Sequence, residues 1–431
     1  TFNFKINSFT ELLGFIFTIL GFSALSLSAN ANACKGEVSE LNVLIQGHPA
    51  MVHMEKHKAD FEAMMGLKVN VTTLGEQERR SQSRVDASTG AGAYQVYYVD
   101  EANIAEFVKG GWVESLDKYF PSGANMDDFQ EGKISIGNIN GTNYFAPFMG
   151  GQDVLMYRKD IFEEKGLSVP TNTDEMLELA KALTDAPNMY GWAQRGQRGS
   201  GMNVWRWNPY HRGFGGEWTN ADGSPNINSS AAVEATKYYM ELFNYAPPGA
   251  RTGTWSDQIE AFRAGKVAMM TANDVFGAWV EDEEKSSVVG KVGYADLPSP
   301  ILSGGFAHGL AISKPGTRTE CEKVMAGELI GWATGQDMEA MRLDEGIYDI
   351  ARKSSASNPK FTSLMPDDFN EAVKATSPKT SLLIWKIPEW PAIGDELGLV
   401  LEELFSGTRT DVQASLDEVQ EYAIKYLEKS N

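Results

Sequence analysis

Two hydrophobic periods alternate along the first third of the chain. Short apolar runs that end in Gly, Pro or polar residues are typical of buried strands, and segments whose apolar residues recur every three to four positions are typical of helices. The strands are expected at 40–46, 68–74 and 94–100, and the helices at 51–66, 76–89 and 104–117. Strands and helices that alternate through short turns predict an α/β fold with a parallel sheet covered on both faces.

The alternation continues with longer helices to the end of the chain. Pro147, Gly150 and Gly151 interrupt a strand-like run, which fits a crossing between two domains, and Thr173 is the expected N-cap of the next helix. The segment 292–300 is expected to cross back. The remaining elements are expected as helices over 171–185, 229–243, 256–263 and 319–335, strands over 267–272 and 306–313, and a mostly helical tail from 367.

Aromatic residues are concentrated in the stretch GMNVWRWNPYHRGFGGEW, residues 201–218. Trp218 precedes a hairpin-like turn and is expected to pack in the core, whereas Trp205 is as well suited to a ligand surface as to packing. Pro209 would start or kink a helix there. A 3-4-3 spacing favours a buried stripe formed by Val204, Trp207, His211 and Phe214.

The N-terminal region has the pattern of an export signal. Leu13 to Leu27 is apolar but shorter than the roughly 20 residues that span a membrane, and Ala31-Asn32-Ala33 fits a cleavage pattern before Cys34. Residues 1–33 are therefore expected to be a cleaved signal peptide that directs the protein to the periplasm. The alternatives are a retained membrane anchor and a buried helix.

Composition narrows the possible partners. The chain has 38 Lys and Arg against 58 Asp and Glu, a net charge of −20, which disfavours nucleic acid and anionic membranes. Its length predicts two domains. The two cysteines, Cys34 and Cys321, are expected to form a disulfide in an oxidising compartment. Lipidation of Cys34, or two free thiols, are the alternatives.

Five segments in a fixed order carry a family resemblance. They are FVKGGWVESLD, YFAPFMGGQDVLMYRKDIFEEKGL, FGGEWTNADGSPNINSSAAVEATKYYMEL, IEAFRAGKVAMM and GLAISKPGT. In this order the chain resembles the extracellular solute-binding proteins that serve ATP-driven (ABC) sugar importers, over roughly residues 41–427. MYGWAQRGQRGSGMN, APPGA and IPEWPAIGDELG are most similar to the branch that binds polyols and related sugars.

The resemblance implies a two-lobe periplasmic binding protein fold with a hinge and a ligand cleft between the lobes. It implies that residues 34–147 plus 299–344 form an N-terminal lobe and 148–298 plus 345–431 a C-terminal lobe. The expected function is capture of a sugar or polyol and its delivery to the transmembrane permease of an ABC importer. The protein is expected to be a monomer, to need no cofactor and not to be an enzyme.

A sugar or polyol site needs aromatic faces against C–H groups, and side chains that donate to and accept from hydroxyls. Ligands of open α/β sheets bind beyond the carboxyl ends of strands, so polar residues at those ends are candidates. Arg195 precedes Gly196 in the polyol-like segment, and Trp205 and Trp255 could supply aromatic surface. Strand ends give Gln46, His48, Glu76, Asp100, Asn273 and Asp274, and the expected crossing between the domains gives Gln152 and Asp153. The resemblance adds Phe306 and His308, which follow SGG as in the family's Gly-Gly-aromatic ligand segment, and Trp385 and Trp390, which flank KIPE in a late loop that approaches the cleft in the resembled branch.

Some of these candidates have a structural alternative. Gln46 and His48 could cap a loop, Asp100 could cap the helix that begins near Asn103, and Arg195 could form a surface ion pair worth little. The spacing of His53 and His57 fits a metal site, but His48 gives no third ligand at a fitting spacing, so no metal is expected.

Three other functions are alternatives to the transport of a sugar or polyol. A polyamine-binding protein would use a carboxylate-lined aromatic box, against which Arg195 argues. A secreted carbohydrate hydrolase needs two carboxylates across one bond, and 58 acidic residues supply such pairs by chance. A receptor-presented sensor would use the same clamp and could coexist with transport.

Overall fold

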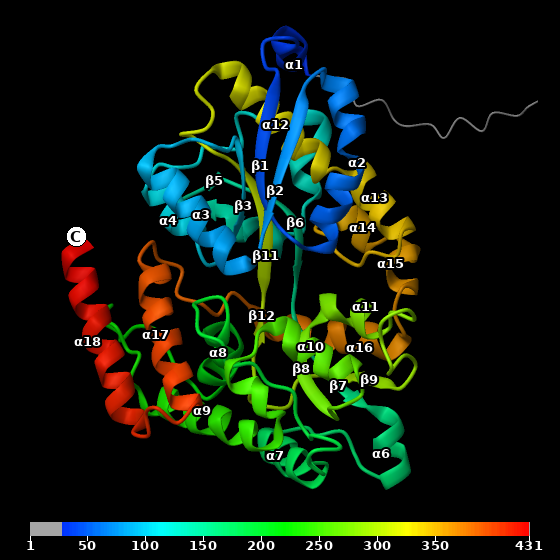
Figure 1. Cartoon of the computed structure of the whole chain (residues 1–431), viewed down its shortest axis with the longest axis vertical. Coiled ribbons are helices and arrows are strands. Elements are labelled where there is room, and N and C mark those ends of the chain that lie inside the picture. Colours follow the sequence, from blue (N-terminus) through cyan, green and yellow to red (C-terminus); the bar gives the residue numbers. More distant parts are fainter. Residues whose placement is uncertain (1–27, 431) are drawn as a thin grey trace, which may run out of the picture.

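The computed structural model describes residues 28–430. Its chain forms two lobes, one above the other, joined by extended segments (Figure 1). Residues 1–27 of the signal peptide expected at 1–33 lie outside the described residues. Residues 29–33 belong to helix α1 (Ala29–Cys34).

The first lobe is built on a five-stranded sheet with the order β2-β1-β3-β11-β6. Its strands are β1 (Glu40–Gln46), β2 (Lys68–Leu74), β3 (Val96–Asp100), β6 (Ala146–Gly151) and β11 (Phe306–Ile312). β1 pairs in parallel with β2 and β3, but β11 runs antiparallel to β3 and to β6. The expected purely parallel sheet is therefore wrong, because β11 enters from the second lobe and runs against the other four strands, whereas β6 runs in the same direction as β3.

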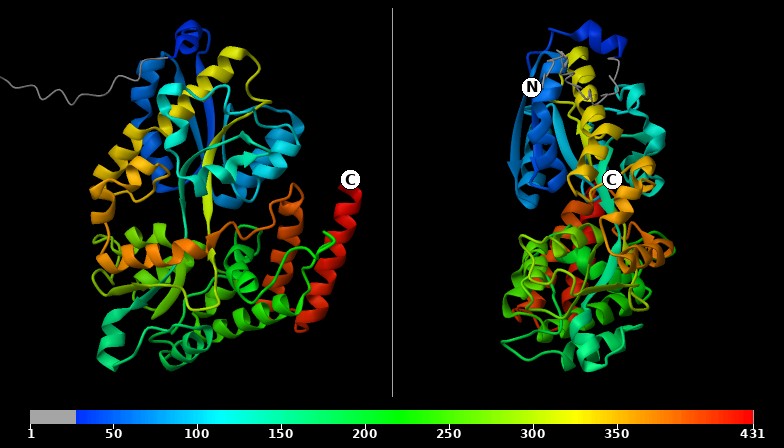
Figure 2. Two further views of the ribbon diagram at one scale, coloured as in Figure 1. Left: turned by 180° about the vertical axis from the view of Figure 1, so that it is seen from behind. Right: turned by 90° about the vertical axis from the view of Figure 1, so that its right-hand side faces the viewer.

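Helices pack around this sheet, as the two views of Figure 2 show. The apolar stripe of α2, which includes Met51, Met54 and Phe61, is buried, and Gly66 ends the helix in a left-handed conformation (φ 73°). The helices of this lobe are α2 (Pro49–Met65), α3 (Glu76–Thr89), α4 (Ile104–Lys109), α5 (Glu131–Ile134), α12 (Glu320–Ala333), α13 (Gln336–Asp344), α14 (Lys353–Ala356) and α15 (Pro359–Ser363).

The second lobe has a smaller sheet of three antiparallel strands, in the order β8-β7-β9. They are β7 (Asp153–Arg158), β8 (Met269–Asn273) and β9 (Val292–Ala295). Residues 292–295 were expected to cross between lobes, but they pair with β7 inside this sheet, and the crossing follows them. Two pairs of short strands lie outside these two sheets. β4 (Asn138–Ile139) pairs with β5 (Thr142–Asn143), and β10 (Ser303–Gly304) pairs with β12 (Thr380–Ser381).

Long helices complete the second lobe, and α17 and α18 lie side by side at its edge (Figure 1). The N-cap of α7 is Asn172, whose side chain accepts from Glu175 N, so the expectation of Thr173 is one residue late. The helices are α6 (Lys159–Lys165), α7 (Thr173–Ala182), α8 (Asn203–Gly213), α9 (Ser230–Leu242), α10 (Trp255–Arg263), α11 (Gly277–Val280), α16 (Asp367–Thr376), α17 (Trp390–Phe405) and α18 (Val412–Ser430).

The chain passes between the lobes three times. The first two passages connect β6 to β7 and β9 to β11, and the third leads from α15 to α16. The segment after residue 344 still contacts the first lobe, because Arg352 donates to the carbonyl of Asn125 and pairs with Asp128. The expected division at residue 344 does not match these contacts, which keep the chain in the first lobe through α15.

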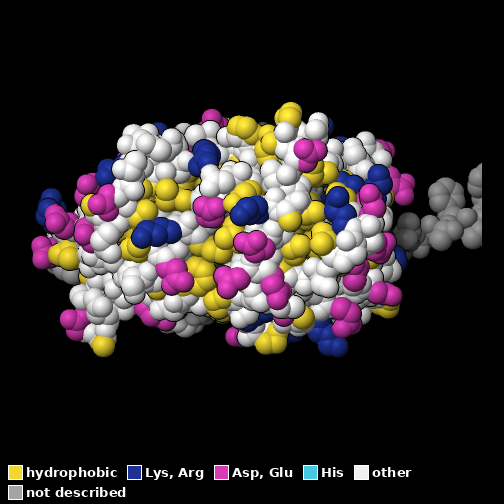
Figure 3. Space-filling model, turned by 90° about the horizontal axis from the view of Figure 1, so that it is seen from below, with side chains coloured by type: hydrophobic (Ala, Val, Ile, Leu, Met, Phe, Trp, Pro, Cys, Tyr) yellow, Lys and Arg dark blue, Asp and Glu magenta, His cyan; other side chains and the backbone are white. Residues whose placement is uncertain are grey.

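Three further features relate to the expected partners and to export: the charges on the surface, the length and polarity of the helices, and the pairing of the two cysteines. Seen from the end of the second lobe, side chains of both charge signs are scattered among apolar ones (Figure 3). Among the described residues, every helix is too short or too polar to cross a bilayer. Cys34 and Cys321 form a disulfide that ties α1 to α12 across a sequence separation of 287 residues.

Candidate ligand cleft between the lobes

A cavity of about 50 Å³ lies where the two lobes meet. One water needs roughly 10–15 Å³ of such space, so the cavity suits a small guest. The first lobe lines it with Gln46, His48, Glu76, Glu101, Met149, Phe306 and His308, and the second lobe with Arg195, Gly201, Trp205, Trp255, Asn273, Val275 and Phe276. Nine of the fifteen expected ligand-binding residues are therefore brought together here.

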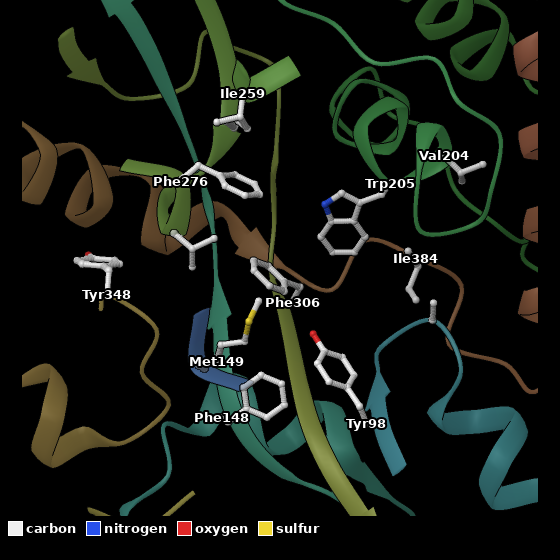
Figure 4. Packing of buried hydrophobic residues seen from close by; sticks show 14 of the residues in the cluster. Tyr98, Phe148, Met149, Val204, Trp205, Ile259, Phe276, Phe306, Tyr348 and Ile384 are labelled. Atoms are coloured by element: carbon white, nitrogen blue, oxygen red, sulfur yellow. The ribbon is translucent and has the colours of Figure 1, made fainter. Parts of the chain in front are cut away.

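Aromatic rings from both lobes form the apolar part of the cavity. Trp255 stacks on Phe276, with ring centroids 5.4 Å apart and planes inclined by 22°. Trp205 meets Phe306 edge-on at 6.1 Å. In the close view, Phe306 lies at the junction, with Phe276 and Trp205 on one side and Met149 on the other (Figure 4).

The aromatic-rich segment 201–218 contributes both to the core of the second lobe and to the wall of the cavity. Residues 203–213 form α8, with Pro209 inside the helix, and Val204, Trp207 and His211 are fully buried. Trp205 projects from the same helix into the cavity wall. Three members of the predicted core stripe are thus buried, whereas Phe214 follows the helix and is only half-buried, and Trp205 lines the cleft.

Arg195 is the principal cation of the cavity. Its side chain is buried, its Nε has no hydrogen-bond partner, and it makes no ion pair with any described residue. Burial, and then the charge of Arg206, lower its pKa to about 10, which leaves it charged at neutral pH. A buried, unpaired guanidinium is costly unless a ligand oxygen accepts from it.

Asp100 lies behind the cavity instead of lining it. Its carboxylate accepts from Arg79 Nη2 and from Arg80 Nε, at 2.5 and 3.0 Å. Burial by itself would raise the pKa of Asp100, but the charges of Arg80 and Arg79 outweigh it and lower the pKa. Arg79 in turn donates to Gln46 Oε1 at 3.2 Å, so Asp100 positions a cavity residue through an arginine.

Asp153 has a similar supporting place in the second lobe. It pairs with Arg206 at 3.0 Å, and Asn273 donates to it at 2.8 Å. Asn273 therefore lines the cavity with its amide held by Asp153. Gln152 and Asp274, also expected at the ligand, instead line a separate cavity of about 500 Å³ together with Lys133.

Acidic and imidazole groups of the first lobe line the opposite wall. Burial raises the pKa of Glu101 well above its ordinary value. Its Oε2 has no hydrogen-bond partner among the described residues, although His308 Nε2 lies 3.6 Å away. His308 contacts Tyr98 through Nδ1, and burial lowers its pKa to about 3, so its ring is neutral. His48 Nδ1 lies 2.9 Å from Asp349.

Trp385, in the loop before α17, and Trp390, the first residue of α17, do not line the cavity. Trp385 stacks parallel to Trp218 at 6.5 Å, and Trp390 meets Trp218 edge-on at 4.9 Å. Trp218 Nε1 donates to the carbonyl of Leu383, which fixes this loop against the second lobe. Trp218 packs as expected, but Trp385 and Trp390 are structural residues here.

Five of the fourteen lining residues are not among the fifteen expected ligand-binding residues, although the strand end at Asp100 also places Glu101 at the ligand-facing rim. Glu101 directly follows Asp100 at the rim of the first sheet, and Val275 and Phe276 follow Asn273 at the end of β8, so the strand ends already marked their neighbourhood. Met149 and Gly201 carried no chemical signal. A Cβ at Gly201 would lie 2.4 Å from the guanidinium of Arg80, so a larger residue there would displace the ion pairs of Arg80 with Glu76 and Asp100.

Two hinged α/β lobes with a small, polar and aromatic cavity between them define a solute-binding protein. The sequence model of the bacterial extracellular solute-binding proteins matches residues 51–340. The chain belongs to this family.

Relatives and solved structures agree over nearly the whole chain. A mannitol-binding protein of Pseudomonas aeruginosa is 25% identical over 387 residues, which cover 84% of this chain and 88% of the relative. A solute-binding protein of Agrobacterium radiobacter K84 in complex with ribitol has a TM-score of 0.82 at 29% identity, over 90% of this chain and 98% of that one. The D-mannitol-bound protein of Agrobacterium vitis S4 shares the fold, with a TM-score of 0.81, 24% identity and 91% and 99% coverage.

Proposed function

We propose that the protein captures a small polyol or a related sugar between its lobes and hands it to the permease of an ABC importer. The observation that carries the proposal is Arg195, a buried charged donor that lines the interlobe cavity, whose Nε has no hydrogen-bond partner and which makes no ion pair within residues 28–430. Hydroxyl oxygens accept from a guanidinium, and a neutral guest needs no counter-charge in the cavity.

The rest of the cavity supports this class of ligand. Trp205, Trp255 and Phe306 offer apolar faces to C–H groups, while Glu101, Gln46 and Asn273 offer donors and acceptors to hydroxyls. A cavity of about 50 Å³ favours a single short polyol or monosaccharide over an oligosaccharide. Relatives named or crystallised with mannitol and ribitol point the same way.

Polyamine binding is the less favoured candidate. A polyamine would bring positive charge beside Arg195, and neither cavity carboxyl is suited to balance it. Glu76 already pairs with Arg80 at 2.7 Å, and burial raises the pKa of Glu101 well above its ordinary value, which favours its neutral form. We also propose that the protein performs no chemistry on its ligand, because the family is one of transport binding proteins. Incubation with each bound solute followed by a search for product tests this point.

We further propose that the chain acts in the periplasm after removal of residues 1–33. Three observations support export: the family consists of extracellular proteins, residues 13–27 are apolar, and Cys34 and Cys321 form a disulfide. The mass of the protein secreted from its native host tests cleavage before Cys34. Calorimetric titration with ribitol, mannitol, maltose and spermidine tests the ligand class. Saturable binding of an alditol is the expected result.

A further inference from the structure

Two histidines and one glutamate meet outside the ligand cavity. His53 and His57 lie one turn apart on α2, and Glu345 follows α13. His53 Nε2 is 3.5 Å, and His57 Nε2 is 3.1 Å, from Glu345 Oε1. The three ligand atoms all lie within 4.8 Å of one another. The sequence offered only the histidine pair, because Glu345 is 288 residues away from His57.

His53 is the least satisfied member of this group. Its side chain is 1% exposed, and neither ring nitrogen has a hydrogen-bond partner among the described residues. Buried polar nitrogens in folded proteins are nearly always partnered. A buried imidazole that faces a carboxylate and a second imidazole therefore points to a ligand that all three can share.

Glu345 is oriented for such a ligand by a neighbour. Lys56 Nζ lies 2.9 Å from Oε2 of Glu345, whereas the two histidines both face Oε1. The lysine thus fixes one carboxylate oxygen and leaves the other directed at the imidazoles. A carboxylate held in this way through its second oxygen is the usual support of a metal ligand.

We propose that His53, His57 and Glu345 form a binding site for a divalent transition metal, with Zn²⁺ as the best fit. Tetrahedral bonds of about 2.0–2.1 Å place ligand atoms roughly 3.3 Å apart, and the observed separations of 3.1 and 3.5 Å bracket this value. Two imidazoles favour zinc over magnesium or calcium, which prefer oxygen ligands.

The surroundings leave room for a fourth ligand. His53 and Glu345 line a cavity of about 480 Å³ between the lobes, so a water can complete the coordination. The segment after Glu345 leads to Asp349, whose carboxylate accepts from Ala50 N and lies beside His48 of the ligand cavity. A metal at this site would fasten that segment to α2.

The test is a titration of the metal-free, disulfide-bonded protein with Zn²⁺ in competition with a chromogenic chelator, without any sugar present. The wild type is expected to bind one Zn²⁺ per chain. His57→Ala and Glu345→Gln are expected to weaken binding at least tenfold. Glu55→Gln, an exposed change on the same helix, is the matched control and keeps the wild-type affinity.

Thermal unfolding separates loss of the site from loss of the fold. In a chelator the wild type, His57→Ala and Glu345→Gln should unfold at similar temperatures, and Zn²⁺ should raise the transition of the wild type and Glu55→Gln only. No stoichiometric binding by the wild type would overturn the proposal. So would equal affinity of the wild type, His57→Ala and Glu345→Gln, which would place the metal elsewhere.

Discussion

Trp255 of the second lobe donates a hydrogen bond from Nε1 to Oε2 of Glu76 in the first lobe, at 3.0 Å. Both residues line the ligand cavity, and the other carboxylate oxygen of Glu76 pairs with Arg80. The bond therefore joins the lobes directly over the cavity. A contact that exists only when the lobes are closed stabilises the closed state and so adds to ligand affinity.

Trp255→Phe should weaken ligand binding about five-fold. The variant keeps an aromatic face against Phe276 but loses one hydrogen bond, which is worth about 1 kcal/mol. Calorimetric titration with the best alditol measures the change. Trp279→Phe is the control, because Trp279 packs in the same aromatic cluster but, among the described residues, donates no hydrogen bond to the first lobe. Equal effects of the two variants would contradict the bridging role of Trp255.

Arg195→Met should weaken binding about ten- to hundred-fold while leaving the fold intact. Hydrogen bonds from a charged donor contribute roughly 1.5–3 kcal/mol, and the methionine fills much of the same space. Removal of an unpaired buried charge should also keep or raise the unfolding temperature of the ligand-free protein. Arg198→Met, at an exposed position three residues later, is the control. Unchanged affinity of Arg195→Met would remove the observation on which the proposed function rests.

Asp274 should make the stability of the protein depend on pH. Burial raises its pKa from 3.8 to about 7, although the charge of Lys133 opposes the rise. Because the folded pKa is the higher one, its favourable contribution is complete below about pH 4 and is lost as the pH rises through 7. The wild type should therefore lose up to roughly 4 kcal/mol relative to Asp274→Asn between pH 4 and 8.

Chemical denaturation at several pH values measures this difference. Glu283→Gln, at an exposed position, is the control and should keep the pH profile of the wild type. A constant stability difference between the wild type and Asp274→Asn across this range would show that Asp274 does not titrate there.

Removal of the disulfide should destabilise the first lobe. The bond between Cys34 and Cys321 closes a very long loop, so Cys34→Ser with Cys321→Ser is expected to cost about 2–5 kcal/mol of unfolding free energy. Reduction of the wild type should reproduce the loss. An intact mass that shows an acylated Cys34 in the exported protein would instead favour the lipidation alternative.

Regular elements could be predicted where local pattern decides them. Short-range periodicity predicts the apolar stripe of α2 and the buried runs of β1 and β3, and Gly66 predicts the end of α2. The structure has these elements within a few residues of their expected bounds. The direction of β11 and the pairing of 292–295 with β7 depend on which distant strand lies alongside, and no local pattern encodes that.

The candidate site divides in the same way. Their positions at strand ends predict that Gln46, Glu76 and Asn273 lie at the cavity, and all three line it. For other candidates, ion pairs with residues distant in the sequence determine whether the side chain reaches the cavity. Asp100 is the last residue of β3 and Asp153 the first residue of β7, and arginines from other elements, Arg80 and Arg206, hold their carboxylates behind the cavity wall. Position along a strand predicts the neighbourhood of a side chain, whereas its partners fix which way the side chain faces.

The most direct test of the central claim is calorimetric titration of the mature protein with ribitol, mannitol, maltose and spermidine, combined with solution scattering. The account predicts saturable one-to-one binding of an alditol or a related small sugar, with a decrease in the radius of gyration as the lobes close. Binding of spermidine alone, or of none of these solutes or of a wider panel of monosaccharides, would contradict it.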